Sequence, residues 1–292
     1  MKRCVLAFSG GLDTSFCVPY LATQGWEVHT AYVNTGGATA LDLEAIARQA
    51  AAVGSVRHHA VDARQAVFDR FVRFLIQGNV LRGEVYPLSV AAERTQQALS
   101  AIEVARAVGA TAIAHGSTGA GNDQVRFDIA FRVLAPELEI LTPIRELGLQ
   151  REQAIAYLEE RKLPVPPKAG AYSINRGLWG TTWGGGWTHD TWAGPPAELV
   201  DPPADAPAAR EIVLGWEQGL PVSLDGATLS GPELIRQLLS EMGLRRLFNH
   251  LLLQAGDTRV MGATQPDTAV YALQRSQPEF REPMWQYVNR RV

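Results

Sequence analysis

The sequence predicts an α/β protein in which a parallel sheet with flanking helices is followed by a smaller α+β domain. Short apolar runs alternate with amphipathic stretches in the first part of the chain, as in proteins whose parallel strands are joined by helical crossovers. Glycine- and hydroxyl-rich turns follow two of those runs. A proline-rich segment at 164–167 then precedes a region with hairpin signals. We therefore predict two domains, 1–165 and 166–292.

Composition excludes several classes of protein. The 292 residues are 46% hydrophobic and 20% charged, with a formal net charge of −3, as in an ordinary globular protein. A slightly acidic chain is not expected to bind nucleic acid or a membrane surface, and no apolar run approaches the length of a membrane span. Cys4 and Cys17 are the only cysteines, which indicates a reducing compartment and a cytoplasmic location. We expect Cys17 to be an inert buried thiol.

Apolar spacing predicts the elements of the first domain. In chain order they are strand 5–8, helix 14–21, strand 27–33, helix 43–50, strand 55–61, helix 66–77, helix 97–108, strand 110–114 and strand 138–141. Gly54 and Gly109 stand where two of these helices should stop. The buried side of helix 66–77 is predicted to carry Val67, Phe71, Phe74 and Leu75.

The second domain gives fewer signals. Residues 211–214 and 222–224 read as a hairpin around Gln218-Gly219. Ser230 and Glu233 have the spacing of a capping box, so a helix should begin there and run to about residue 242, with a further apolar stretch at 244–254. Four tryptophans are interpreted as packing anchors rather than ligand platforms: Trp179, Trp183, Trp187 and Trp192.

The first candidate site follows the first strand, where the chain reads Ser9-Gly-Gly-Leu-Asp-Thr-Ser15. Two glycines allow a sharp turn, and the amides of a helix N-terminus attract an anion. The stretch lacks the Gly-Lys-Ser/Thr ending of a Walker loop and the Gly-x-Gly-x-x-Gly of a dinucleotide site. We therefore predict a phosphate or pyrophosphate cradle, and the alternative is an ordinary strand-to-helix turn.

Two more polar segments fall at predicted strand ends. Asn34 follows the second strand and either contacts a ribose or adenine or forms a plain turn; spacing alone does not separate the two. Residues 115–127 follow the strand at 110–114 and combine three glycines with hydroxyl, amide, carboxylate and guanidinium groups. Arg126 can fork onto a carboxylate, and Asn122 and Asp123 can fix an amine or amide. A substrate pocket is the favoured interpretation, a mobile connection the alternative.

Three stretches in this order resemble argininosuccinate synthase, whose phosphate loop is that of an N-type ATP pyrophosphatase. They are Ala-x-Ser-Gly-Gly-Leu-Asp-Thr-Ser at 7–15, Thr-Gly-x-Gly-Asn-Asp-Gln-Val-Arg-Phe at 118–127, and Tyr-Ser-x-x-x-x-Leu at 172–178. The resemblance extends to about residue 240. It implies a Rossmann-like sheet of the HUP (adenine nucleotide α-hydrolase) type and a ligase of arginine biosynthesis. Such an enzyme adenylates the ureido oxygen of citrulline, and the amine of aspartate then displaces AMP.

The resemblance also implies site residues. ATP contacts are carried over to Ala7, Ser9, Gly10, Gly11, Asp13, Thr14, Ser15 and Gly116, beside Asn34 from its strand-end position. Contacts with aspartate are carried over to Thr118, Asn122 and Asp123, and contacts with citrulline to Tyr86, Asn122, Arg126 and Ser173. Arg94 is a further substrate-binding candidate, and catalytic roles are carried over to Asp13, Ser15 and Arg126. Mg²⁺ is expected to accompany the pyrophosphate, and no protein metal site is predicted. A homo-oligomer is expected.

The chain departs from the family pattern on the citrulline side. Val90 and Ala91 stand where the family has hydroxyl residues, and Asn175 where it has a carboxylate. The family's later Gly-Arg-x-Asp and Gly-x-Lys-Ser-Arg stretches do not occur. Each lost partner of a charged substrate group costs about 1–3 kcal/mol. The activated substrate is therefore citrulline or another ureido or carboxylate compound.

Other functions stay open from sequence alone. A ligase of the same mechanism with a non-citrulline substrate in specialised metabolism is one, and a non-catalytic nucleotide-binding paralogue is another. Another enzyme with the same phosphate loop, such as a tRNA thiolase or NAD synthetase, is a weaker alternative. A tRNA thiolase usually has catalytic cysteines or a basic RNA-binding surface, and neither is evident in the sequence.

Overall fold

A computed structural model of the chain describes residues 2–80, 88–119, 122–167, 173–184 and 212–238. The contacts divide the chain into two compact units: Met1–Ala63 with Glu93–Ala169, and Arg64–Ala92 with Gly170–Val292. Each unit is formed by two separate pieces of chain. The linear division at 165/166 stays a prediction, and it does not anticipate that residues 64–92 group with the later part of the sequence.

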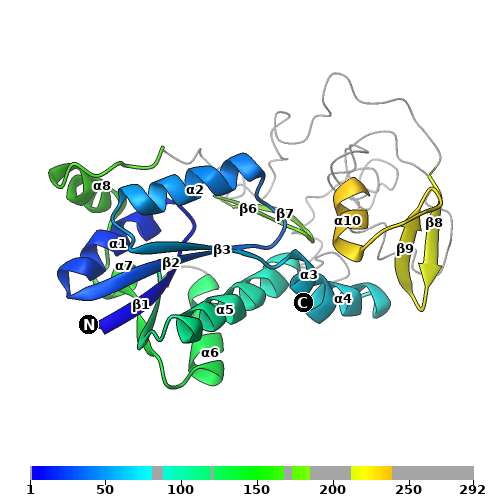
Figure 1. Cartoon of the computed structure of the whole chain (residues 1–292), viewed down its shortest axis with the longest axis horizontal. Helices are drawn as coiled ribbons and strands as arrows, with labels where there is room; N and C mark the ends of the chain where they lie inside the picture. Colours follow the sequence, from blue (N-terminus) through cyan, green and yellow to red (C-terminus); the bar gives the residue numbers. More distant parts are fainter. Residues whose placement is uncertain (1, 81–87, 120–121, 168–172, 185–211, 239–292) are drawn as a thin grey trace, which may run out of the picture. The chain divides into compact units, whose positions relative to one another are not determined.

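The first unit is organised around a parallel sheet of five strands with the order β3-β2-β1-β4-β5 (Figure 1). The strands are β1 (Lys2–Ala7), β2 (Trp26–Asn34), β3 (Arg57–Asp62), β4 (Ala112–His115) and β5 (Glu139–Leu141). From β1 the chain moves outward to β2 and β3, and it then returns to the other side of β1 as β4. The strand order therefore reverses between β1 and β4, where open α/β sheets bind ligands at the carboxyl ends. The predicted α/β fold class is confirmed.

Helices cover both faces of this sheet (Figure 1). They are α1 (Leu12–Thr23), α2 (Ala40–Ala52), α5 (Ser89–Ala107), α6 (Asp123–Leu134), α7 (Pro143–Glu146) and α8 (Arg151–Glu160). Leu6 of β1 belongs to a core cluster with Phe16 of α1 and Leu158 of α8. The neighbouring Val5 belongs to a second cluster with residues of α5 and α6. Alternate strand residues thus enter different cores, as in a sheet buried on both faces.

Several predicted elements needed correction. Helix α5 begins at Ser89 rather than 97, and α6 and α8 were not predicted at all. The predicted helix 66–77 consists of α3 (Arg64–Val67), a π-helix η1 (Phe68–Val72) and α4 (Arg73–Gln77). The wider π turn shifts the helical phase. As a result Val72 and Ile76 are buried, whereas Phe74, predicted to be buried, is 58% exposed.

The second unit has its own core. It contains α3, η1 and α4, the antiparallel pairs β6 (Ser173–Gly177) with β7 (Gly180–Gly184) and β8 (Leu214–Glu217) with β9 (Leu220–Leu224), the short β10 (Ala227–Thr228), and α10 (Gly231–Arg236). Trp179 is fully buried against Val67, Phe68 and Ile235, which confirms it as a packing anchor. Gln218 and Gly219 both have positive φ, as a tight hairpin turn requires.

Other expectations are met or fall outside the described ranges. The side chain of Ser230 accepts a hydrogen bond from the amide of Glu233 and so caps α10. Both cysteines are buried, and burial raises the pKa of Cys4 to about 12 and that of Cys17 further. Within the described ranges, no helix has both the length and the apolarity needed to cross a bilayer. The apolar stretch at 244–254, Trp187 and Trp192 lie outside those ranges.

Candidate functional site

The first loop, residues 8–15, connects β1 to α1 in a conformation that requires glycine. Gly10 has a φ of +78°, and a Cβ at this position would lie 3.1 Å from Cγ1 of Ile46 on α2. Thr14 Oγ1 lies 3.2 Å from Ser9 Oγ and donates to the carbonyl of Gly11. Gly11 is the N-cap of α1 and has no side chain to cover the helix amides. The loop therefore presents a helix N-terminus suited to an anion.

The two predicted catalytic residues of this loop differ in exposure. Ser15 is fully buried, and its Oγ accepts a hydrogen bond from Gln49 Nε2 at 3.1 Å. The same Gln49 amide donates to the carbonyl of Pro164, so it ties α1 to the end of the first unit. Asp13 is half-buried, and burial raises the pKa of its carboxyl while the charge of Arg151 opposes that rise. The catalytic roles of both residues stay predictions.

The second loop, residues 116–126, begins beside the first. Ala7 and His115, the last residues of β1 and β4, are register partners in the sheet. A Cβ on Gly116 would lie 3.0 Å from Cγ2 of Thr14 and 3.4 Å from the carbonyl carbon of Asp13. The backbone at Gly116 therefore lies against the first turn of α1, and glycine is needed there for close approach rather than for an unusual φ.

Three predicted substrate residues form a charged group at the start of α6. Arg94 Nε donates to Asp123 Oδ2 at 2.9 Å, and Arg126 Nη1 donates to Asp123 Oδ1 at 2.8 Å. Arg94 also donates to Gln97 on its own helix. Two guanidinium groups thus share one carboxylate, which leaves a net positive charge at a helix N-terminus. This electrostatic arrangement suits a carboxylate ligand.

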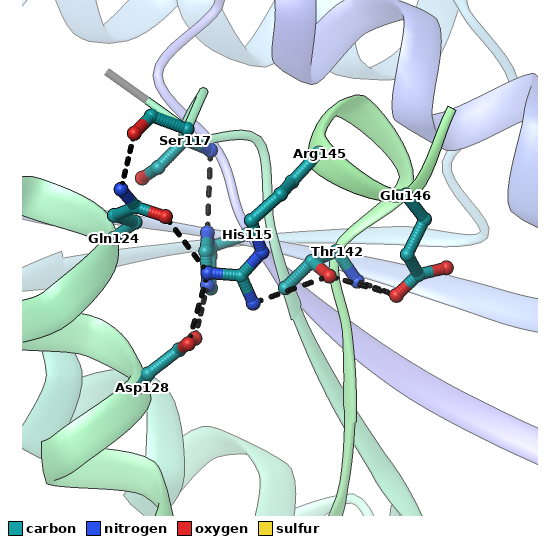
Figure 2. Close-up of polar contacts among 8 residues, drawn as sticks. His115, Ser117, Gln124, Asp128, Thr142, Arg145 and Glu146 are labelled. Carbon is teal, nitrogen blue, oxygen red and sulfur yellow. Dashed lines mark hydrogen bonds and ion pairs between the residues drawn. The ribbon is translucent and has the colours of Figure 1, made fainter. Parts of the chain in front are cut away.

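A partly buried polar network centred on His115 supports the second loop (Figure 2). His115 is 1% exposed, accepts a hydrogen bond from the Ser117 amide at Nδ1, and contacts Asp128 through Nε2 at 2.9 Å. Arg145 donates to Asp128 and to Gln124. These residues were not identified as functional from the sequence, because Arg145 is distant from the loop in sequence and Asp128 lies just beyond the motif, where its contact with His115 depends on how α6 packs.

The pKa values of His115 and Asp128 follow from burial and from hydrogen bonding, which act to different extents on the two groups. Burial lowers the pKa of His115, and its contact with Asp128 only partly opposes this, so the imidazole is neutral at neutral pH. For Asp128, burial alone would raise the pKa, but hydrogen bonds from His115 and Arg145 outweigh burial and lower it. The network therefore pairs a neutral histidine with an ionised carboxylate and a guanidinium.

The remaining predicted site residues lie outside the two contact groups described above. Asn34 is buried and its Oδ1 accepts a hydrogen bond from the Gly36 amide, the contact of an Asx turn. Ser173 begins β6 in the second unit, and Tyr86 lies outside the described ranges. Thr118 and Asn122 are exposed in the second loop. Among the described residues, no group of three or more His, Cys, Asp or Glu side chains forms a metal site.

Comparison with known families bears on what these loops bind. The family model described as "Arginosuccinate synthase N-terminal HUP domain" matches residues 3–164, which is more than half of the chain. The chain belongs to the argininosuccinate synthase family. The matched region contains both loops and all of the parallel sheet except Lys2, the first residue of β1, so the family assignment and the observed fold agree.

Curated relatives named argininosuccinate synthase match most of this chain. The protein of Halalkalibacterium halodurans is 38% identical over 242 residues, those of Trichodesmium erythraeum and Synechococcus sp. (strain WH7803) 41% over 244 and 43% over 257. These matches cover 81–84% of this chain but only 59–63% of the relatives. The chain thus spans about three fifths of the length of the curated relatives it matches.

Among solved structures, a chain described as a predicted subunit of tRNA methyltransferase from Methanocaldococcus jannaschii aligns with a TM-score of 0.38 at 15% identity. It covers 55% of this chain and 75% of that one. A likeness at this level carries no argument about fold or function.

Proposed function

We propose that this protein is an ATP-dependent ligase of the argininosuccinate synthase type. It adenylates a ureido substrate, citrulline or an analogue, or a carboxylate, and joins it to the amine of aspartate with release of AMP and pyrophosphate. One observation carries the proposal: the backbone at Gly116 lies against Thr14 and Asp13, so the first and second loops adjoin at the strand-order reversal. A phosphate loop beside a loop for an amino acid is the arrangement that this reaction requires.

The first loop would hold the triphosphate of ATP. Its contribution is the helix N-terminus after Gly10 and Gly11, which stabilises negative charge on the pyrophosphate. Mg²⁺ would neutralise further charge on the phosphates; it commonly uses only one or two carboxylates beside phosphate oxygens, and Asp13 is the carboxylate within this loop. The buried Ser15 would help to hold α1 in position, because its Oγ accepts a hydrogen bond from Gln49 on α2.

The second loop would hold aspartate. Arg94 and Arg126 are already fixed by Asp123, so a substrate carboxylate meets guanidinium groups that need little reorganisation. Catalysis then consists mainly of positioning the amine near the adenylated carbon and stabilising charge. We further propose that the protein acts in the cytoplasm, as a homo-oligomer.

The identity of the activated substrate is the open part of the proposal. Val90 and Ala91 lie in the first turn of α5, at positions where the family pattern has hydroxyl residues. This difference favours, as a second candidate, a ligase of the same mechanism whose activated substrate is not citrulline.

The test measures pyrophosphate release by the full chain with ATP, Mg²⁺ and aspartate. Citrulline is added first, and other ureido and carboxylate compounds follow. We expect release that depends on one such compound, with a product that contains the aspartate nitrogen by mass spectrometry. Citrulline-dependent release favours argininosuccinate synthesis, and release with another compound favours the second candidate. No binding of ATP by calorimetry would overturn both.

A matched pair of variants tests the second loop. Arg126→Lys keeps the charge but loses the planar fork, so we expect kcat/KM for aspartate to fall about 10–100-fold. Arg132→Lys changes an exposed arginine on the same helix and should leave kcat/KM within about twofold. Equal effects of the two variants would contradict the assigned role of Arg126.

A further inference from the structure

Six residues close a ring of hydrogen bonds around one short segment of the second loop (Figure 2). The Ser117 amide donates to His115 Nδ1 at 3.2 Å, and His115 Nε2 contacts Asp128 Oδ1 at 2.9 Å. Arg145 Nη1 donates both to Asp128 Oδ2 at 2.9 Å and to Gln124 Oε1 at 3.0 Å. Gln124 Nε2 completes the ring by donating to the carbonyl of Gly119. We call this set the His115 ring: His115, Ser117, Gly119, Gln124, Asp128 and Arg145.

The ring fixes both ends of a three-residue segment. Ser117 and Gly119 are its anchored backbone groups, and Thr118 lies between them with an exposed side chain. The anchoring side chains come from the end of β4, from α6 and from α7, which are rigid elements of the first unit. A segment tied at two points to rigid elements keeps its amides and hydroxyl in one arrangement.

The ring also determines the tautomer of His115. A backbone amide can only donate, so Nδ1 must be the acceptor for Ser117 and the proton must lie on Nε2, where it points at Asp128. Phe127 and Phe131 flank the imidazole, with ring centroids 5.6 and 6.2 Å away. These apolar neighbours keep water from replacing either partner.

A second set of contacts ties the ring to the end of β5. Arg145 Nη2 donates to Thr142 Oγ1 at 3.4 Å (Figure 2). The hydroxyl and the backbone amide of Thr142 in turn donate to Glu146 Oε1, at 2.7 and 3.0 Å. The loops after two neighbouring strands are thus connected through one guanidinium. Arg145 is only partly exposed, at 31% of its side chain, which limits competition from solvent.

We propose that His115, in its neutral Nε2-protonated form, is a positioning residue that holds the segment 117–119 as the seat for a carboxylate of the amino-acid substrate. The inference rests on the proposed function for the identity of that substrate. His115 does not touch the substrate: it acts through the Ser117 amide, while Gln124 fixes the other end of the segment. Asp128 and Arg145 hold both in place.

Protonation of His115 should therefore release the segment. A proton on Nδ1 would face the Ser117 amide proton, and the bond between them would be lost. The charged groups that face the imidazole are Asp128 from α6 and Arg145 and Glu146 from α7. The two carboxylates favour protonation and the guanidinium opposes it, and burial favours the neutral form. Affinity for the amino acid should fall on the acid side.

Two substitutions of His115 separate positioning from simple packing. His115→Asn places an amide oxygen near the position of Nδ1 and can still accept from Ser117, whereas His115→Gln places its amide near Nε2 and leaves the Ser117 amide without an acceptor. Both remove the aromatic ring from the core. If His115 only fills space, the two variants should be equally impaired; if it positions the loop, His115→Gln should be worse.

Hydrogen exchange of the Ser117 amide is the readout that does not depend on any activity. Measured by NMR on the full chain, exchange should accelerate about tenfold or more in His115→Gln and stay within about threefold of the wild type in His115→Asn. In kinetics, KM for aspartate should rise about tenfold in His115→Gln, with KM for ATP within about twofold. For the wild type we expect kcat/KM for aspartate to fall on the acid side, and His115→Asn should lose this dependence.

Gln124→Met provides a second variant, at a less buried position, in case the His115 variants do not fold. It removes the anchor of Gly119 and should raise KM for aspartate by about 3–10-fold without affecting ATP. Glu137→Gln, which removes the surface pair with Arg106 near the other end of α6, is the control and should change neither constant.

The outcomes are distinct. Equal exchange and equal KM in the two His115 variants overturn the positioning role, as does a folded Gln124→Met with unchanged KM for aspartate. If the wild type releases no pyrophosphate with any substrate, the proposed function fails, but the exchange comparison still decides whether the ring holds the segment.

Discussion

The first and second loops lie side by side at the carboxyl edge of the sheet but are held in place in different ways. Ser9, Gly11 and Thr14 of the first loop bond one another over no more than five positions of sequence. The second loop depends on contacts of longer range, His115 with Asp128 over 13 positions and Arg145 with Asp128 over 17. A loop that binds through backbone amides needs only its own turn geometry, whereas one that binds through charged groups needs those groups fixed from outside.

The largest expected effect on stability and binding comes from overpacking the contact between the two loops at Gly116. In Gly116→Ala the new Cβ meets Thr14 Cγ2 at 3.0 Å and its backbone nitrogen at 3.3 Å. Overpacking of this kind should cost about 1–3 kcal/mol of unfolding free energy and weaken nucleotide and amino-acid binding together. Urea denaturation and calorimetry measure both effects.

Thr14→Ser in the same chain tests the cause. It removes Cγ2 but keeps the hydroxyl that bonds Ser9 and Gly11. The double variant should regain part of the loss, because one of the two close contacts is relieved. If the double variant is no more stable and binds no more tightly than Gly116→Ala, the steric clash with the threonine methyl is not the cause of the loss.

An effect of intermediate size is expected when the glycine at the turn of the first loop is replaced, and a glycine elsewhere with the same backbone conformation serves as the control. Gly10→Ala and Gly25→Ala both force alanine into a left-handed backbone, and each should cost about 1–2 kcal/mol of stability. Only at Gly10 does the new Cβ meet another side chain, Ile46, at 3.1 Å; at Gly25 nothing lies within 4 Å. Only Gly10→Ala should weaken ATP binding in calorimetry, and equal binding by both variants would contradict the assignment of the first loop.

The smallest effect is the pH dependence of the second loop. Because the pKa of His115 is lowered in the folded state, the unfolded chain binds more protons as the pH falls below about 6.5. The stabilisation present at pH 7.5 should therefore decrease towards pH 5.5. His58 and His59, whose pKa values burial also lowers, contribute equally to the wild type and to His115→Asn.

Comparison of the two proteins by urea denaturation at the two pH values isolates His115. The wild type should lose more unfolding free energy than His115→Asn between pH 7.5 and 5.5. An equal loss in both would show that the histidine does not change its protonation in this range. Asp128 stays ionised throughout, since its pKa is lowered from an already acidic value.

The features that could be predicted from the sequence are those that depend on local contacts, as in the first loop, and not those that depend on long-range contacts, as in the second. Local patterns sufficed for the strand, turn and helix around Ser9–Ser15, and for the hairpin turn at Gln218-Gly219, although the first strand of that hairpin is Leu214–Glu217 rather than 211–214. Asp128 and Arg145 could not be found in this way, since their positions follow from how α6 and α7 pack and not from any spacing near the second loop. Thr14 and Asp123 were named from motifs, but their partners required coordinates.

The sequence prediction failed where the spacing of apolar residues does not follow the buried face of a helix. In α6 four apolar residues are exposed, namely Val125, Ile129, Val133 and Leu134, so the usual rule that apolar spacing marks the buried face does not apply there. In the segment from Arg64 to Gln77, the π-helix η1 breaks the 3.6-residue period on which the prediction of its buried face depended.

The placement of residues 64–92 in the second unit has a consequence for how this chain is made. Val72 and Ile76 leave the ribosome about a hundred residues before Trp179, the side chain they pack beside, which at 5–20 residues per second is on the order of ten seconds. During that interval their apolar surface has to be shielded by something other than its final neighbours. A fragment cut at residue 165 would keep that surface permanently in water, so expression trials should retain the whole chain.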